Sequence, residues 1–325
     1  MQELSHFQQR FTDYLQSRPF RKSPVGLYEP VDYILSLGGK RLRPAVLLCA
    51  HHLFADDWER ALPAALGVEV FHNFTLLHDD IMDQSPLRRG KPTVHERWNS
   101  ETAILSGDVM MIQSYELLRE TGSERLNRLL EVFNRTAIEV CEGQQMDMDF
   151  ERRNDVTVEE YVRMIELKTS VLFGAALQLG ALLGGAGEED AQHLYDFGRN
   201  LGIAFQIQDD YLDTFGTAAQ VGKRIGGDIL RNKKTYLAIS ARNRALGDLA
   251  TELHEWYADD TDLEDDKIAR VTQIFRKLGV ERIANEAKES YYEKAMAHLA
   301  QVQSPHAERK QLLEQLAKML IHRNR

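Results

Sequence analysis

The chain has 325 residues, of which 43% are hydrophobic and 28% are charged, and its formal net charge is −10. This composition is typical of a globular protein with a large core, and the acidic balance argues against non-specific binding to nucleic acid. Cys49 and Cys141 are the only cysteines. Both lie among apolar helical residues, so we expect two buried free thiols and no disulfide framework. The N-terminal residues lack the apolar core of a signal peptide, which favours a cytoplasmic location.

Helices are the elements predicted along the chain. Pro44 suits the first turn of a helix that follows a Gly-Gly pair. Apolar residues at three- and four-residue steps predict a helix over 125–142, and residues 157–160 (Thr-Val-Glu-Glu) form a capping box that opens another. We find no alternating strand pattern and no linker rich in proline or serine. The sequence therefore predicts an all-α fold with a single domain over residues 1–325.

Residues 169–187 carry no charge and approach the minimum length for a membrane-spanning helix. The segment is interrupted by several glycines, and Gln178 lies in its middle. A helix that is apolar on all sides in a large globular protein is usually a core helix. We therefore expect a buried central helix here and no transmembrane segment.

Two motifs of the form D-D-x-x-D lie in apolar stretches at opposite halves of the chain. Residues four apart share one face of a helix, where like charges repel unless a cation lies between them. Mg²⁺ in proteins typically uses one or two carboxylates together with substrate phosphates. The motifs therefore predict a site for divalent cations and a diphosphate, formed by Asp79, Asp80 and Asp83 with Asp209, Asp210 and Asp213.

Basic residues accompany both motifs. Arg88 and Arg89 follow the first motif after a Ser-Pro break, and guanidinium groups beside metal-binding carboxylates are suited to a diphosphate. Salt bridges to the same aspartates remain the alternative. A segment rich in glycine and lysine, 216–235, follows the second motif and suggests a mobile lid, with an ordinary flexible loop as the alternative.

Two further basic segments suggest anion binding. Residues 38–44 (GGKRLRP) place three cations at the start of a helix, where free N–H groups and the helix dipole favour an anion. Lys168 precedes the apolar helix and could instead only extend its amine towards solvent. His72, considered alone, would suit an ordinary core histidine.

Together, these motifs resemble those of the trans-isoprenyl diphosphate synthases of the polyprenyl synthetase family. The matching segments are GGKRLRP, HDDIMD, LRRG, KT, FQIQDD, and GKRIGGDI with NKKT, in the family's order between positions 38 and 235. The resemblance implies an all-α isoprenoid-synthase fold, a helical bundle around a deep central cavity, and a homodimer. It also implies Mg²⁺-dependent transfer from an allylic diphosphate (dimethylallyl, geranyl or farnesyl) to isopentenyl diphosphate, giving a short-chain all-trans product.

The resemblance assigns a role to each motif residue. Two Mg²⁺ ions would be held by Asp79 and Asp83 and a third by Asp209, with Asp80, Asp210 and Asp213 in support. The allylic diphosphate would contact Arg88, Lys168, Lys223 and Lys233, and isopentenyl diphosphate would contact Lys40, Arg43, His72 and Arg89. The catalytic residues near the reacting carbon would be Lys168, Thr169 and Gln206.

Product length is predicted from the residues one helical turn before Asp79. Phe74 and Thr75 would face the growing chain, and the bulky ring of Phe74 should block long products. In the family, an aromatic residue at this place with the short aspartate motif resembles the short-chain synthases. We therefore expect a C20 product, with C15 as the close rival and core packing of Phe74 as the alternative.

Two other functions share part of this pattern. A class I terpene cyclase would not need GGKRLRP as a second diphosphate site, and its second metal motif is usually of the N-D-x-x-S-x-x-x-E type. A non-catalytic subunit of a heteromeric synthase would tend to lose an aspartate motif, whereas both are intact here. The sequence therefore favours an elongating prenyltransferase.

Overall fold

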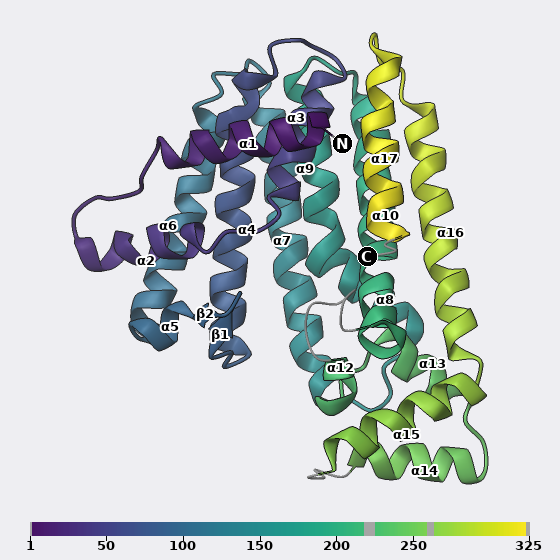
Figure 1. Cartoon of the computed structure of the whole chain (residues 1–325). Helices are drawn as coiled ribbons and strands as arrows, with labels where there is room; N and C mark the ends of the chain where they lie inside the picture. Colours follow the sequence, from purple (N-terminus) through teal and green to yellow (C-terminus); the bar gives the residue numbers. More distant parts are fainter. Residues whose placement is uncertain (1, 218–224, 259–262, 323–325) are drawn as a thin grey trace. The chain divides into compact units, whose positions relative to one another are not determined.

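The computed structural model describes residues 2–217, 225–258 and 263–322, and within them the all-α prediction is confirmed (Figure 1). One short hairpin, β1 (Leu87–Arg88) and β2 (Lys91–Pro92), was not predicted, because two-residue strands are too short to show an alternating pattern. The α-helices are α1 (Gln2–Gln16), α2 (Val25–Ser36), α3 (Leu42–His52), α4 (Leu62–Met82), α5 (Val94–Arg97), α6 (Ser100–Arg119), α7 (Leu126–Glu151), α8 (Val158–Ile165), α9 (Val171–Leu183), α10 (Glu188–Phe215), α12 (Gly227–Leu230), α13 (Tyr236–Arg244), α14 (Asp248–Ala258), α15 (Glu264–Lys277), α16 (Val280–Gln301) and α17 (Lys310–Ile321). The 3-10 turns Trp58–Ala61 and Ala307–Arg309 and the π-helical turn Glu166–Ser170 complete the set.

The chain divides into two compact units. Unit 1 comprises residues 1–137, 172–195 and 301–315, and unit 2 comprises residues 138–171, 196–300 and 316–325. Because each unit is built from three separate segments, the chain passes between them several times. The prediction of a single domain over residues 1–325 stays a prediction.

Unit 1 is organised around α4, which packs against α3 and α6, while α1 lies across α3 and α4 (Figure 1). Pro63 occupies the first turn of α4, where its missing N–H costs no hydrogen bond. Most side chains of α4 from Leu62 to Phe74 are buried. A helix that is apolar on nearly every side is stable only when it is surrounded, so α4 forms a rigid support for the aspartates at its C-terminal end.

Unit 2 has its own core, to which α8, α13, α15 and the second half of α10 contribute. The predicted capping box is confirmed: the Thr157 hydroxyl accepts from the Glu160 N–H, and the Glu160 carboxylate accepts from the Thr157 N–H. Two otherwise unpaired donors at the start of α8 are thereby satisfied. The α14–α15 pair lies at the lower end of Figure 1.

The apolar segment around α9 is a buried helix, as predicted. In the part of the chain that is described, one helical stretch, Val158–Leu183, is long and apolar enough to cross a membrane. However, 83% of the 18-residue window that meets this test is buried within the protein. The burial fits a core helix better than a membrane span.

The prediction for the cysteines is half right. Cys49 is buried in α3, but Cys141 is exposed on α7, so the prediction of a second buried thiol is wrong. On α7 the buried face is formed at this level by Val140 and Gln144, and Cys141 lies one position further round the helix. Apolar neighbours in sequence therefore did not place Cys141 on the inner face.

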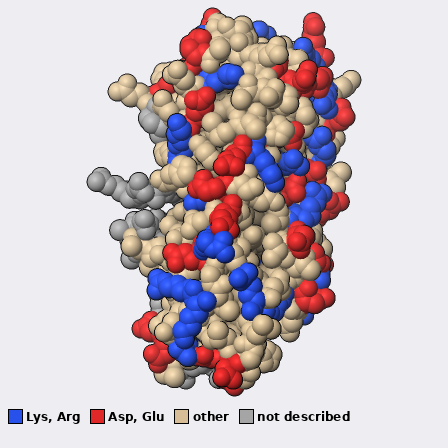
Figure 2. Space-filling model, turned by 90° about the vertical axis from the view of Figure 1, so that its right-hand side faces the viewer, with Lys and Arg blue, Asp and Glu red and all other residues tan. Residues whose placement is uncertain are grey.

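Acidic and basic side chains are interspersed over the face drawn in Figure 2. Local mixing of this kind compensates charge over short distances. It agrees with the argument from net charge against non-specific nucleic-acid binding.

Candidate active site

The first aspartate motif lies at the C-terminal end of α4. Asp79 is partly buried, whereas Asp83 is the exposed C-cap residue, and its N–H donates to the Asp79 carbonyl at 2.8 Å. The two carboxylates share one helix face. In the described residues, no group of three Asp, Glu, His or Cys side chains is placed to hold a metal ion. The pair therefore suits Mg²⁺ only if a substrate supplies further oxygen atoms, as diphosphates do.

Asp80 faces inward and pairs with Arg88. Only 2% of Asp80 is exposed, and its two carboxylate oxygens accept from Nε and Nη2 of Arg88, each at 2.7 Å. This bidentate geometry is the strongest that an arginine makes with a carboxylate. The salt bridge left open as an alternative is therefore present, and contact of Arg88 with a diphosphate stays a prediction.

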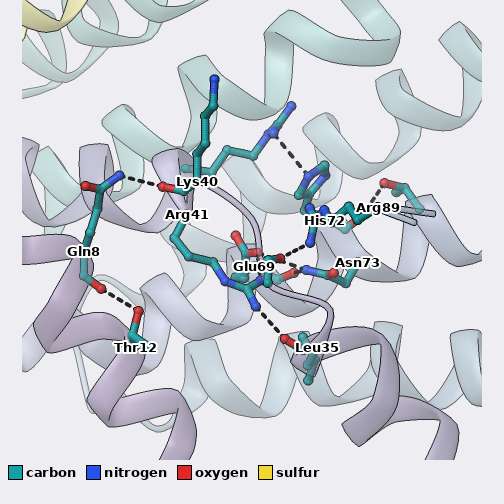
Figure 3. Close-up of polar contacts among 12 residues, drawn as sticks. Gln8, Thr12, Leu35, Lys40, Arg41, Glu69, His72, Asn73 and Arg89 are labelled. Carbon is teal, nitrogen blue, oxygen red and sulfur yellow. Dashed lines mark hydrogen bonds and ion pairs between the residues drawn. The ribbon is translucent and has the colours of Figure 1, made fainter. Parts of the chain in front are cut away.

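Three of the four residues predicted to bind isopentenyl diphosphate, Arg43, His72 and Arg89, lie close together within unit 1 (Figure 3). Nη1 of Arg43 lies 3.3 Å from Nε2 of His72, and Nη1 of Arg89 donates to the Gly38 carbonyl. Burial and the charges of Arg43 and Arg89 lower the pKa of His72 well below its ordinary value, so the ring is neutral at pH 7. Burial also lowers the pKa of Arg43 and of Arg89.

Several positive charges crowded in a partly dry site favour a bound anion, because each cation has lost part of its hydration. Within the described part of the chain, the buried Nε of Arg43 has no hydrogen-bond partner. An unsatisfied buried donor of this kind is costly and often marks a place that a ligand occupies. The cluster is thus suited to a phosphate group.

Arg41 has a structural role that differs from the role predicted for its basic neighbours. It is buried at the start of α3 in a left-handed conformation (φ 47°), where its guanidinium pairs with Glu69 and donates to the Leu35 carbonyl. Glu69 also accepts from Asn73, at 3.0 Å. The exposed side chain of Lys40 extends away from that of Arg41 in Figure 3. Arg41 therefore anchors the segment, and Lys40 remains accessible to a ligand.

Gly39 permits the close approach of Arg89. Its φ of 128° is a conformation that other residues rarely adopt, and a Cβ atom here would lie 2.7 Å from Nη2 of Arg89. A side chain at the second position of GGKRLRP would therefore clash with Arg89, which explains why this position is glycine. It allows two basic segments to meet although Gly39 and Arg89 lie 50 positions apart in the sequence.

The second aspartate motif lies on the part of α10 that belongs to unit 2. Asp210 is 5% exposed and accepts hydrogen bonds from the Tyr161 hydroxyl, from the Tyr236 N–H at 3.4 Å and from the Gln206 side chain. Burial raises the pKa of Asp210 to about 7, although these hydrogen bonds oppose the rise. Burial and the nearby Asp210 raise the pKa of Tyr161 well above its usual value. Asp210 is therefore held inside the fold and suits a supporting role.

Asp213 is also turned inward. It is 1% exposed, its Oδ2 accepts from the Asp228 N–H at 2.9 Å, and its carbonyl accepts from the Gly226 N–H at 2.6 Å. Asp209, which is partly buried, is the most accessible aspartate of this motif. This order of exposure agrees with Asp209 as the predicted metal ligand and Asp213 as a support.

Lys168 and Thr169 lie on the π-helical turn between α8 and α9. The Lys168 amine donates to Asp147 Oδ2 on α7 at 2.6 Å. Such turns are frequent at functional sites, because the extra residue redirects side chains. Asp147 was missed by the sequence analysis, because its partner Lys168 lies 21 positions away and no local pattern links the two residues.

The remaining predicted contacts for the allylic diphosphate follow the second motif. Lys233 is exposed, and its N–H donates to the Asp228 carbonyl at 3.0 Å. Lys223 and much of the predicted lid lie outside the described residues. These two roles therefore stay predictions.

Phe74 and Thr75 occupy neighbouring faces of α4. Phe74 is 8% exposed, and its ring lies 5.5 Å from the Phe71 ring and 4.8 Å from the His78 ring, measured between centroids. The Thr75 hydroxyl donates to the His72 carbonyl of its own helix at 2.8 Å. Phe74 thus combines tight packing with a place one turn before Asp79.

Comparison with known proteins identifies the class. The family model for polyprenyl synthetase matches residues 24–275. A geranylgeranyl diphosphate synthase of Methanosarcina mazei is 46% identical over 220 residues, which are 67% of this chain and 68% of that protein. A geranylfarnesyl diphosphate synthase of Natronomonas pharaonis is 37% identical over 93% of this chain and 92% of its own length. A crystal structure of a geranylgeranyl pyrophosphate synthase covers 99% of both chains, with 46% identity and a TM-score of 0.93.

The chain therefore belongs to the polyprenyl synthetase family. It has the all-α isoprenoid-synthase fold and is a prenyltransferase of the short-chain prenyl diphosphate synthase type. Enzymes of this family are Mg²⁺-dependent and use isopentenyl diphosphate with an allylic diphosphate. The prediction of an elongating enzyme is confirmed, and a terpene cyclase or a non-catalytic subunit is correspondingly disfavoured.

Proposed function

We propose that this enzyme makes a C20 all-trans prenyl diphosphate and that its two aspartate motifs bind the allylic diphosphate through three Mg²⁺ ions. The observation that carries the proposal is the sequence of features along α4. Asp79 and Asp83 share a face at its end, the Arg43, His72 and Arg89 cluster lies beside it, and Phe74 lies one turn earlier. Chain elongation of limited length requires a metal-binding site, an anion-binding site and an apolar side chain that blocks further growth. The residues on and beside α4 could supply all three.

The acidic residues would bind the cations, and the basic residues would bind the diphosphates. Asp79, Asp83 and Asp209 would hold the ions, which when bound would stabilise negative charge on the diphosphate. Arg88, Lys168, Lys223 and Lys233 would contact the allylic diphosphate, and Lys40, Arg43, His72 and Arg89 would hold isopentenyl diphosphate. Asp80, Asp210 and Asp213 would support the motifs from inside the fold.

The reaction needs no protein nucleophile. The allylic C–O bond breaks, its electron pair leaves with the diphosphate, and the double bond of isopentenyl diphosphate supplies electrons for the new C–C bond. The proton lost from the condensed product would go to the released diphosphate. Lys168, Thr169 and Gln206 would lie near the reacting carbon, and the surrounding apolar side chains would exclude water from the carbocation.

Related enzymes frame the choice of product. The names of the relatives include C20 and C25 synthases, and C15 remains the alternative from the sequence. The aromatic ring at Phe74 supports a short product, because it fills space that a longer chain would need. We further propose a cytoplasmic homodimer whose chain is a single domain around a deep central cavity, and no nucleic-acid partner.

One experiment tests the assignment. Purified enzyme is incubated with Mg²⁺, labelled isopentenyl diphosphate and dimethylallyl, geranyl or farnesyl diphosphate in turn, and the dephosphorylated products are separated by length. We expect a C20 product from each accepted primer and longer products from Phe74→Ala. A main product of C15 or C25 would contradict the C20 assignment, and absence of elongation with every primer would contradict the function itself.

A further inference from the structure

His78 links the ring of Phe74 to a neighbouring helix. It follows Phe74 by four residues on α4, so both side chains lie on one face, and their rings meet edge to face at 4.8 Å. Nε2 of His78 lies 3.2 Å from the Ile104 carbonyl on α6. Because that carbonyl can only accept, the nitrogen facing it carries the proton.

Gly107 makes this arrangement possible. A Cβ atom at Gly107 would lie 2.3 Å from Nε2 and 2.6 Å from Cδ2 of His78, well inside any tolerated contact. The imidazole therefore occupies the space that a side chain on α6 would otherwise fill. Any residue larger than glycine at this position would displace the imidazole from its place between the helices.

The opposite side of Phe74 is fixed independently. Phe71 lies 5.5 Å from Phe74 and 5.1 Å from Phe133, and both Phe71 and Phe133 are fully buried. Aromatic contacts of this kind stabilise a particular ring orientation as well as burying area. Phe74 is thus held between a rigid aromatic cluster and one polar ring, and the polar ring is the side that a single substitution can release.

We propose that His78 is a positioning residue that sets product length through Phe74, and that Gly107 on α6 is required for its placement. This inference rests on the proposed role of Phe74. When the imidazole is in place, the Phe74 ring cannot turn towards α6, and the space beyond it stays closed to a growing chain. When the imidazole is removed, the ring gains a void to turn into, and elongation continues further.

Product length is the measurement, because a merely structural role of His78 would change yield and leave length unaltered. We expect His78→Ala to shift the main product by at least one C5 unit at matched low conversion. His78→Phe retains an edge-to-face ring contact and should restore the wild-type length. Wild-type length in His78→Ala, or failure of His78→Phe to restore it, would overturn the proposal.

Gly107→Ala tests the same relation from α6 without altering α4. The added methyl group should displace the imidazole and change the product distribution. Gly26→Ala is the matched control, since a Cβ at this helical glycine meets nothing within 4 Å. Equal product distributions in Gly107→Ala and Gly26→Ala would contradict the required role of Gly107.

A double substitution separates this inference from the function on which it rests. In a Phe74→Ala background, His78→Ala should cause no additional lengthening, because the positioned ring is already absent. Additive lengthening would show that His78 acts independently and would overturn the proposal. Unchanged length in Phe74→Ala alone would instead contradict the role assigned to Phe74.

Discussion

At the end of α4, Asp80 is held by the guanidinium of Arg88 through two hydrogen bonds of 2.7 Å. At the same position of the second motif, Asp210 is held by a phenol, Tyr161, and by a backbone N–H. Both carboxylates are buried, but in the part of the chain that the structure describes Asp80 pairs with a cation, whereas the partners given above for Asp210 are uncharged. Two identical D-D-x-x-D patterns can thus be stabilised by different interactions, an ion pair in the first and uncharged hydrogen-bond donors in the second.

The last aspartates of the two motifs differ as well. Asp83 is exposed at the end of its helix, whereas Asp213 is 1% exposed and its carboxylate accepts a hydrogen bond from the Asp228 N–H. The first motif therefore offers two carboxylates to a ligand, and the second offers mainly Asp209. This difference agrees with two cations at the first motif and one at the second.

The largest expected effect tests whether both motifs bind the same diphosphate. Asp79→Ala and Asp209→Ala should each lower kcat by at least about 100-fold, because each removes a cation that stabilises the leaving group. Steady-state assays with saturating Mg²⁺ measure the loss, and circular dichroism checks that the fold is retained. Near-normal turnover in either variant would remove that motif from the active site.

A smaller effect separates the two kinds of support. Arg88→Ala leaves the buried Asp80 without its cation and should lower the free energy of unfolding by about 3 kcal/mol. Tyr161→Phe removes one of several hydrogen bonds to Asp210 and should cost about 1 kcal/mol. Urea denaturation of both variants measures the difference. A larger loss for Tyr161→Phe than for Arg88→Ala would reverse this view of the two motifs.

The sequence predicted the helices, the capping box and the convergence of Arg43, His72 and Arg89, because each depends on short-range patterns or on a complete set of motifs. Only the family resemblance assigned Lys40 to the substrate and left Arg41 without a role; the residue types themselves gave no reason to separate the two. Their chemistry is alike, and the left-handed backbone of Arg41 and its distant partner Glu69 decide which one is buried.

The different supports of Asp80 and Asp210 were equally hidden. The two motifs have the same spacing, and the partner Tyr161 lies 49 positions from Asp210 along the chain. The π-helical turn that carries Lys168 was likewise not part of the prediction from the sequence. Long-range partners of this kind become visible only in the folded chain.

The last test concerns pH and isolates Asp210. Its folded-state pKa of about 7 lies above the ordinary value of 3.8. The folded state therefore binds more protons, and this contribution to stability, complete below about pH 4, is lost as pH rises through 7. Asp210→Asn cannot ionise, so its stability relative to the wild type should improve as pH rises from about 4 to about 7, by at most about 4 kcal/mol. Urea midpoints in EDTA, with Asp80→Asn as the control that breaks an ion pair at every pH, measure the trend. A constant difference between Asp210→Asn and the wild type across this range would show that folding leaves the pKa of Asp210 unshifted, and would contradict the uncharged support assigned to the second motif.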